Sequence, residues 1–293
     1  SRLPPVRRLV ARSAWPGRVE HGPAATRLLA AAGSGLCIVE LQGVLFFGSA
    51  TRLVDELDAV LAAPQPPRWL LLDFQRVPSL DSSAAQTLLK LDKAARQAGA
   101  QLHCSGLPDA QRQLLAAAGF VPGAAQLHAD IDAAVRTWDD GVLAQQPGAD
   151  SDVHAWLAQE LGSAAAAQQV LAHFDTLQLA AGDTLFSQGD APDALYLLAE
   201  GRLVARLGTV AVRSLHAGSV VGEMGLFRDA LRSASVAADL PSRVLRLSRA
   251  GLQALELQAP ALGLALHRLL IRQLAGRLEQ ASAQAVALSQ AGR

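Results

Sequence analysis

The sequence predicts an α/β domain with a mixed sheet and packed helices, followed by a mainly-β domain with flanking helices. Strand-like apolar runs alternate with stretches of helical spacing from residue 36 to residue 143, as in a sheet covered by helices. Residues 182–201 instead place an apolar run between the turn dipeptides Gly189-Asp190 and Glu200-Gly201, which is typical of consecutive strands joined by turns. A polar stretch that begins at Pro147 predicts a linker over 147–151.

The elements of the first domain, expected over 30–146, follow from the spacing of apolar residues. The run at 69–74 is continuous, as expected for the centre of a sheet covered on both faces. Other strands are predicted at 36–42, 101–105 and 125–128, and helices at 49–63, 82–97, 108–118 and 131–143.

Composition and charge exclude several classes of protein. The chain has 293 residues, enough for two domains, and 26 basic against 26 acidic residues, so no nucleic-acid partner is indicated. It contains no run of 18 apolar residues, so we expect this fragment to be soluble. Cys37 and Cys104 lie in apolar strand-like runs, which predicts buried, reduced thiols in a cytosolic protein.

The sequence offers no catalytic or metal-binding pattern. The seven histidines are scattered, and none has metal-ligand spacing with a cysteine or a carboxylate. Neither a P-loop nor a Gly-x-Ser-x-Gly motif occurs. We therefore expect a non-enzymatic protein without a metal.

Two segments of the first domain carry a family resemblance. Residues 40–50, Glu-Leu-Gln-Gly-Val-Leu-Phe-Phe-Gly-Ser-Ala, and residues 77–84, Val-Pro-Ser-Leu-Asp-Ser-Ser-Ala, resemble STAS domains of the SulP anion-transporter type. In the related anti-sigma-factor antagonists the serine that matches Ser83 is a phosphoacceptor, although those proteins usually have glycine where this chain has Ala84. The residues alone leave a simpler alternative, in which Asp81 or Ser82 caps a helix and Ser83 only starts its first turn.

The N-terminal residues 1–29 are basic. Six arginines against Glu20 give residues 1–27 a local charge of +5. The resemblance to SulP transporters implies a juxtamembrane segment attracted by anionic lipids, a membrane transporter domain of the same polypeptide as partner, and a location at the cytoplasmic face of the inner (plasma) membrane. A solvated tail, suggested by the prolines and glycines of this stretch, is the alternative.

In the second domain, the residues from Gly222 to Ser235 combine a glycine, a carboxylate and an arginine in a short span. Glu223 can accept a hydrogen bond from a sugar hydroxyl, and the guanidinium of Arg232 can bind phosphate oxygens. Gly222 lets the backbone approach a ligand closely. This order of residue types points to a ligand that contains both a ribose and a phosphodiester.

Together with the spaced glycines upstream, this segment is similar to cyclic-nucleotide-binding domains over about residues 152–280. The resemblance implies a jelly-roll barrel within residues 152–293 and cAMP or cGMP as the ligand. It implies the following roles: Glu223 on the ribose 2′-hydroxyl, Arg232 on the cyclic phosphate, Ser233 near phosphate or base, and the N–H groups of Met224 and Gly225 in a phosphate cradle. The alternative is a barrel without ligand, in which Glu223 and Arg232 pair with each other.

A C-terminal helix is predicted over 260–280, where leucines recur at intervals of four. The resemblance implies that this helix is a lid over the nucleotide, whereas a helix packed permanently on its own barrel or on a second copy in a homodimer is the alternative. The overall prediction is a regulatory region of a SulP-type transporter that senses a cyclic purine nucleotide. The alternative is a soluble partner-switching protein controlled by phosphorylation at Ser83.

Overall fold

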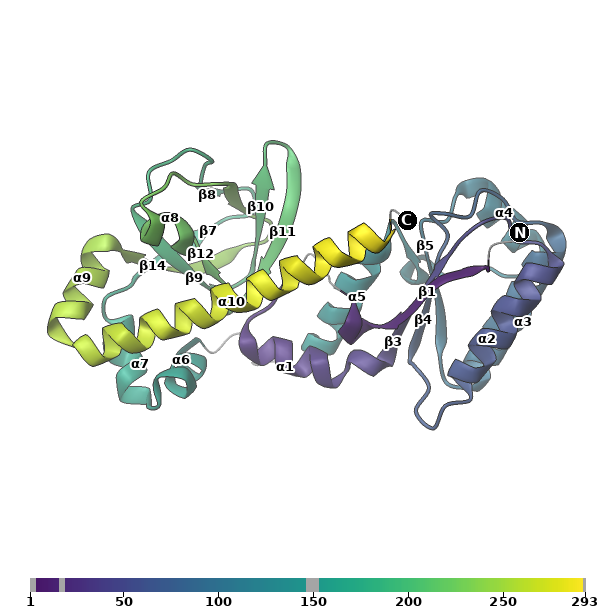
Figure 1. The fold of residues 1–293 in the computed structure, drawn as a ribbon, viewed down its shortest axis with the longest axis horizontal. Coiled ribbons are helices and arrows are strands. Elements are labelled where there is room, and N and C mark those ends of the chain that lie inside the picture. The colour runs from purple at the N-terminus through teal and green to yellow at the C-terminus, as the bar shows by residue number, and fades with distance from the viewer. Residues whose placement is uncertain (1–3, 16–18, 146–152, 292–293) are drawn as a thin grey trace. The chain divides into compact units, whose positions relative to one another are not determined.

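The computed structural model describes residues 4–15, 19–145 and 153–291 and divides the chain into two compact units (Figure 1). The N-terminal unit comprises Ser1–Trp15 and Leu28–Val142, and the C-terminal unit comprises Pro16–Arg27 and Leu143–Arg293. Residues 1–29, predicted as a separate basic segment, are therefore shared between the two units. The predicted linker at 147–151 lies outside the described residues.

A five-stranded mixed sheet forms the centre of the N-terminal unit. Its order is β1-β3-β4-β5-β6, where β3 to β6 are parallel and β1 is antiparallel to β3. The strands are β1 (Val6–Ala11), β3 (Leu36–Leu41), β4 (Trp69–Asp73), β5 (Gln101–Ser105) and β6 (Leu127–His128). The predicted α/β fold of this half is confirmed.

Helices pack on both faces of this sheet, because successive residues of a strand point to opposite sides. Leu70 and Leu72 contribute to the core formed with α2 (Phe47–Leu61), α3 (Ser82–Gln97) and α4 (Asp109–Ala117), whereas Leu71 packs with Trp138 of α5 (Ile131–Ala144). Cys37 and Cys104 are buried and free. Burial raises the pKa of Cys37 to about 11 and that of Cys104 to about 12, which keeps both thiols protonated.

Two arginines of the N-terminal segment are built into the fold. Arg7 on β1 pairs with Glu40 at 2.7 Å, and Arg12 binds Asp139 of α5 through two hydrogen bonds. These interactions differ from the expected lipid-facing or solvated tail, because carboxylates of the same unit satisfy the charges. The segment continues through β2 (Val19–Glu20) into α1 (Pro23–Ala31).

The C-terminal unit contains two sheets that form a β-barrel-like core. One sheet has the order β2-β11-β10-β13-β8 and the other β12-β9-β14-β7. Their strands are β7 (Asp175–Leu179), β8 (Thr184–Phe186), β9 (Ala194–Glu200), β10 (Arg202–Leu207), β11 (Val210–His216), β12 (Val220–Val221), β13 (Ser235–Ala238) and β14 (Ser242–Ser248). Strand β9 is buried on both faces: Tyr196 and Leu198 point into the space between the sheets, and Leu195 and Leu197 pack with helices.

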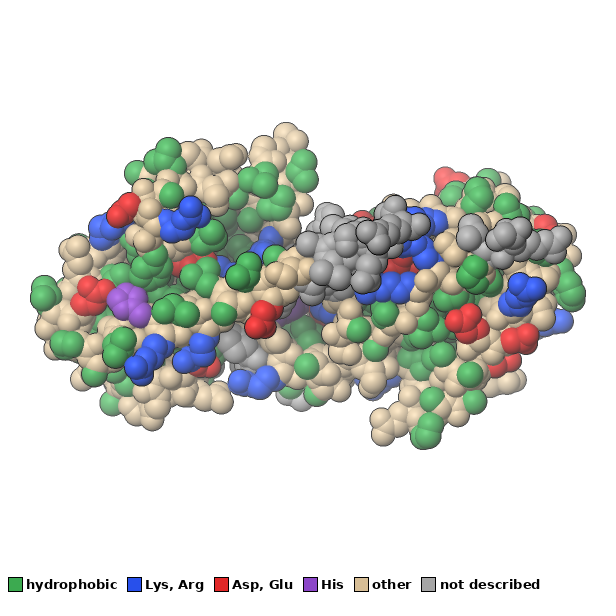
Figure 2. Space-filling model, in the orientation of Figure 1, with side chains coloured by type: hydrophobic (Ala, Val, Ile, Leu, Met, Phe, Trp, Pro, Cys, Tyr) green, Lys and Arg blue, Asp and Glu red, His purple; other side chains and the backbone are tan. Residues whose placement is uncertain are grey.

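The helices of this unit are α6 (Val153–Leu161), α7 (Ala164–Leu171), the short α8 (Glu223–Arg228), α9 (Arg249–Gln258) and α10 (Pro260–Ala291). Helix α10 is longer than predicted. Leu266, Leu269 and Leu270 anchor its first half in the core, while Figure 2 shows hydrophobic side chains among charged ones on its outer side. None of the helices among the described residues has the length and apolarity needed to cross a membrane.

Candidate functional site

The candidate site is built around Gly222, which joins β12 to α8. Gly222 has a positive φ of 82°, a conformation that glycine adopts without strain. A Cβ at this position would lie 2.5 Å from Nη1 of Arg232. A glycine is therefore required both by the turn and by the close approach of the arginine.

Arg232 is buried beneath this turn, with only 4% of its surface exposed. It donates to the carbonyl oxygens of Gly222 at 2.7 Å and Ala194 at 2.6 Å, and to Oδ1 of Asp193 at 3.2 Å. Its guanidinium carbon lies 4.3 Å from the centroid of the Phe186 ring. The Nε atom is buried without a hydrogen-bond acceptor, so this buried cation retains an unused donor.

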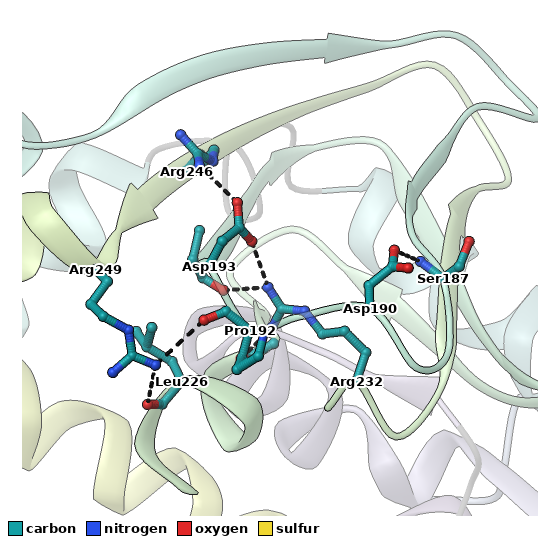
Figure 3. Close-up of polar contacts among 10 residues, drawn as sticks. Ser187, Asp190, Pro192, Asp193, Leu226, Arg232, Arg246 and Arg249 are labelled. Carbon is teal, nitrogen blue, oxygen red and sulfur yellow. Dashed lines mark hydrogen bonds and ion pairs between the residues drawn. The ribbon is translucent and has the colours of Figure 1, made fainter. Parts of the chain in front are cut away.

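Asp193 is shared between two arginines, as Figure 3 shows. Its Oδ2 accepts a hydrogen bond from Arg246 at 2.8 Å, on the opposite side from Arg232. Burial by itself would raise the pKa of Asp193, but the hydrogen bond and charge of Arg246, together with the charge of Arg232, lower that pKa below its usual value. Arg232 therefore shares its carboxylate partner, Asp193, with a second arginine.

Two segments distant in sequence meet at Arg232. Its backbone N–H donates to the carbonyl of Asp190 at 2.9 Å, and its own carbonyl accepts from Gly189 at 2.9 Å. Within the same turn the carboxylate of Asp190 accepts from the N–H of Ser187 at 2.8 Å (Figure 3). The turn predicted at Gly189-Asp190 thus fixes the backbone on which Arg232 is mounted.

Arg249, at the start of α9, holds the end of α8. It pairs with Asp229 at 2.7 Å and lies 3.4 Å from the carbonyl oxygens of Leu226 and Pro192. Asp229 has a positive φ of 50°, which ends α8 after six residues. Through Arg249 the candidate site is connected to the helices that follow the barrel.

Glu223 is 3% exposed and forms an ion pair with Arg277 of α10. Arg277 also donates to the carbonyl oxygen of Val220. The C-terminal helix therefore contacts the carboxylate to which the family resemblance gives the ribose 2′-hydroxyl. Arg232 and Glu223 have separate partners, Asp193 and Arg277, which differs from the alternative interpretation in which these two residues pair with each other.

The remaining predicted residues lie around this centre. Gly225 is buried, and a Cβ there would come within 3.0 Å of Pro192 and of the Ala230 carbonyl. Met224 is 47% exposed and Ser233 is exposed. The side chains of Glu223 and Arg232 are therefore buried, whereas those of Met224 and Ser233 face solvent.

Ser83 is exposed in the first turn of α3, in the N-terminal unit. Asp81 caps this helix by accepting the N–H of Ala84 at 2.7 Å. Ala84 is fully buried, so the hydroxyl of Ser83 stands next to a packed residue but is itself accessible. Asp81, not Ser82, provides the cap.

Sequence reasoning missed Asp193, Arg246 and Arg277. Asp193 directly follows Gly189-Asp190-Ala191-Pro192, where the sequence predicts a turn but gives no sign that the next residue pairs with an arginine. Arg277 lies in the predicted C-terminal helix, 54 residues from Glu223, and no local pattern links them. Among the described residues no group of three or more His, Cys, Asp or Glu is placed to hold a metal ion.

Comparison with known proteins identifies both units. Residues 30–121 match the family model described as "Mlab, STAS domain", and residues 176–258 match that of the cyclic nucleotide-binding domain. Both are families of regulatory modules. Their order along the chain is the one that the sequence predicts.

Individual relatives match different parts of the chain. "Glutaminase 2" of Bradyrhizobium diazoefficiens is 29% identical over 273 residues, covering 87% of this chain and 42% of that protein. The cAMP-dependent protein kinase regulatory subunit of Emericella nidulans is 37% identical over 83 residues, 28% of this chain and 20% of the subunit. This chain thus spans less than half the length of either relative.

Among solved structures, a cyclic nucleotide-binding domain from Methylobacillus flagellatus is 24% identical with a TM-score of 0.40, covering 44% of this chain and 74% of that one. The two family matches, together with the mixed sheet of the first unit and the two sheets of the second, lead to one conclusion. The chain carries a STAS domain followed by a cyclic nucleotide-binding domain.

Proposed function

We propose that the C-terminal unit binds a cyclic purine nucleotide, cAMP or cGMP, and that the chain is a non-catalytic regulatory region. The observation that carries this proposal is the state of Arg232. A buried guanidinium with an unused Nε donor and a shared counter-charge is suited to an anion that supplies further acceptors. A cyclic phosphate is such an anion.

The other residues of the site complete the recognition. Arg232 binds the phosphate, with the N–H groups of Met224 and Gly225 and the hydroxyl of Ser233 as further donors. Glu223 accepts the ribose 2′-hydroxyl. The positive φ of Gly222 and the absence of a Cβ keep the backbone close to the ligand.

Binding is proposed to act on α10 through the pair Glu223–Arg277. Glu223 is buried, so a ribose hydroxyl that bonds to it competes with Arg277 for the same carboxylate. Displacing Arg277 also removes its bond to Val220. The helix would then respond to occupancy of the site, because Arg277 pairs with the carboxylate that the proposal assigns to the ribose hydroxyl.

The test is calorimetric titration of the purified chain with cAMP, cGMP and, as a matched control, 5′-AMP, which keeps the base and ribose but lacks the cyclic phosphodiester. Saturable heat with a cyclic nucleotide and at least about tenfold weaker binding of 5′-AMP are expected, a difference of 1.4 kcal/mol. Absence of heat and of any thermal shift with millimolar cAMP and cGMP would eliminate the proposal.

The regulated partner is a further part of the proposal. The resemblance of residues 40–50 and 77–84 to SulP-type STAS domains supports a membrane transporter domain of the same polypeptide, at the cytoplasmic face of the inner membrane. The arginines near the N-terminus add little to this, because Arg7 and Arg12 pair with carboxylates of their own unit. A soluble partner-switching protein, phosphorylated at the exposed Ser83, and a homodimer remain compatible with the fold.

A second candidate partner is favoured by a specific observation. The match to the Bradyrhizobium glutaminase runs through both units, and more than half of that protein lies outside the match. A glutaminase-type enzyme regulated by this STAS and nucleotide-binding pair is therefore the alternative to the transporter. The gene sequence upstream of residue 1 distinguishes the two: several long apolar spans favour the transporter, and an enzyme-sized globular domain favours the glutaminase.

A further inference from the structure

The guanidinium of Arg232 contacts aromatic rings as well as polar groups. Its Cζ atom lies over two rings, 4.3 Å from the centroid of Phe186 on β8 and 5.7 Å from that of Tyr196 on β9. The two rings lie 5.8 Å apart, with their planes tilted by 30°. The face of an aromatic ring is negative and attracts a cation within about 6 Å, so both rings are within reach of the charge. We call Phe186 and Tyr196 the aromatic seat.

The aromatic seat belongs to the apolar core between the two sheets of the barrel. Tyr196 is buried in this core, and the partly buried Phe186 packs against it. The attraction between a cation and a ring is stronger when the cation is desolvated, and Arg232 is buried. The aromatic seat therefore stabilises the arginine at a place where a charge is costly to bury.

Backbone pairing fixes the position of Phe186 relative to Arg232. Phe186 lies opposite Val236 in the pairing of β8 with β13. Arg232, which precedes β13, is joined to the turn that follows Phe186: its N–H donates to Asp190, and its carbonyl accepts from Gly189, both at 2.9 Å. The ring and the guanidinium are thus mounted on the same pair of hydrogen-bonded segments.

Tyr196 is held by a different strand. It lies opposite Arg246 in the pairing of β9 with β14. The Tyr196 side chain interacts with Arg246 and, after Asp193, raises the pKa of that arginine above its usual value, against the effect of burial. Arg246 therefore fixes both the second ring of the aromatic seat and the carboxylate that it shares with Arg232.

The aromatic seat compensates the charge of Arg232 without using its hydrogen-bond donors. The terminal nitrogens donate to the carbonyl oxygens of Gly222 and Ala194 and to Asp193, whereas Nε has no acceptor. A buried cation with an unpaired donor gains free energy by turning toward another acceptor. Attraction to the rings opposes that movement and still leaves Nε for a ligand.

We propose that Phe186 is a positioning residue of the nucleotide site, and that with Tyr196 it holds the guanidinium of Arg232 in the orientation that leaves Nε to the phosphate. The role in recognition rests on the proposed function. The attraction between the aromatic seat and the arginine does not, because it exists without a ligand.

The first test is a double-mutant cycle in the ligand-free chain, followed by native-state hydrogen exchange of β9. Phe186→Leu removes the ring, and Arg232→Met removes the charge but keeps an unbranched side chain. With the arginine present, Phe186→Leu should raise the opening equilibrium constant of β9 by about five- to thirtyfold more than it does in the Arg232→Met background. Equal effects in the two backgrounds would overturn the proposal.

The second test compares affinities for cAMP by calorimetric titration and needs no change at Arg232. Phe186→Leu should weaken binding by about fivefold or more, because the binding-competent orientation of the arginine is less populated. Phe186→Tyr keeps the ring and should keep most of the affinity. Two controls leave the aromatic seat in place: Phe174→Leu truncates a partly buried phenylalanine of another core cluster in the same unit, and Leu203→Ala weakens the core around the seat. Both controls should lower stability and leave the affinity unchanged.

A merely structural role of Phe186 predicts instead that affinity follows stability. Leu203→Ala would then weaken binding as much as Phe186→Leu, and that result would overturn the proposal, as would wild-type affinity in Phe186→Leu. Should Arg232→Met fail to fold, the affinities still decide. If the wild-type chain binds neither cAMP nor cGMP, the proposed function fails and with it the role of Phe186 in recognition, whereas the ligand-free cycle still shows whether the rings hold the arginine.

Discussion

Two arginines, one in each unit, differ in how their charge is satisfied: Arg12 is partly buried and Arg232 is buried. Arg12 uses Nε and Nη2 on both oxygens of Asp139, at 2.9 and 2.7 Å, and its Nη1 lies 3.3 Å from the Trp15 carbonyl. Arg232 donates mainly to carbonyls, shares Asp193 with Arg246, and leaves Nε without an acceptor. We interpret the arginine whose three nitrogens are all engaged as structural, whereas the arginine that keeps an unused Nε is the one proposed to bind a ligand.

The largest effect that tests this difference is on stability. Arg12→Ala removes both hydrogen bonds that Arg12 donates to the buried carboxylate of Asp139, and breaking a buried pair costs about 3–5 kcal/mol. Urea unfolding followed by tryptophan fluorescence should show the loss, since three of the four tryptophans lie in the N-terminal unit. Arg112→Ala removes an exposed pair with Asp109 and should change stability little. A small effect of Arg12→Ala would refute the structural assignment.

The matching change in the other unit should affect binding. Arg232→Ala removes the proposed phosphate contact, a loss of about 2–5 kcal/mol for a desolvated charge partner, and so should weaken cAMP binding by well over tenfold. Stability should fall less than in Arg12→Ala, because Asp193 is half exposed and keeps Arg246. Arg243→Ala, at an exposed pair with Glu200, is the binding control. Wild-type affinity in Arg232→Ala would show that its unused donor does not mark a ligand site.

Much of the fold could be predicted because it depends on local patterns. The continuous run at Trp69–Asp73 and the helical spacing at Ser82–Gln97 both appear in the structure. Strand β1 was missed because Arg7 and Arg8 interrupt its apolar pattern, and the partner that compensates them, Glu40, is more than thirty residues away. Arg277 was missed for the same reason: a charge that is satisfied by a distant carboxylate leaves no periodic signal.

Arg277 is intermediate between Arg12 and Arg232. It is paired with a carboxylate, that of Glu223, but this carboxylate is also proposed to bind a ribose hydroxyl. If a ribose hydroxyl must displace Arg277 from Glu223, Arg277→Gln should tighten cAMP binding by roughly threefold to tenfold, up to 1.4 kcal/mol. Arg272 lies on the same helix as Arg277, and Arg272→Gln removes a more exposed pair with Glu160 of α6, so it should leave the affinity unchanged. Weaker binding in Arg277→Gln would mean that Arg277 supports the bound state instead.

His103 shows that an unused buried nitrogen does not by itself mark a ligand site, because Nε2 of His103 is also buried without a hydrogen-bond partner. Burial, and next the neighbouring His128, whose Nε2 lies 3.0 Å from Nδ1 of His103, lower the pKa of His103 to about 4. The ring is therefore neutral at pH 7, and an unmet nitrogen on a neutral ring costs far less than one on a buried cation. An unused donor therefore indicates a ligand site only when the group is charged.

The pKa of His103 has a consequence for stability against pH. The unfolded chain takes up the proton near pH 6.5, whereas the folded chain resists it to about pH 4, so stability is complete above pH 6.5 and falls as the pH is lowered toward 4. Over the whole interval the loss is roughly 3 kcal/mol, and between pH 7 and 6 it is about 0.7 kcal/mol. Urea unfolding at pH 7, 6 and 5 should show the slope, and His103→Phe should flatten it. His154→Gln, at an exposed histidine, should not; an unchanged slope in His103→Phe would assign the dependence to other groups.

The smallest effect is expected at Ser83, where the candidate site of the STAS unit lies at the surface instead of in the core. Ser83→Asp places a negative charge in the first turn of α3, where the helix dipole favours it by roughly 0.3–1 kcal/mol. The side chain is exposed, so the unfolding midpoint should stay level or rise slightly. Ala84→Asp, one residue along at a fully buried position, should destabilise the unit severely and serves as the contrast. A large loss of stability in Ser83→Asp would show that the serine is structural, and would leave the STAS unit without an accessible phosphorylation switch at this turn.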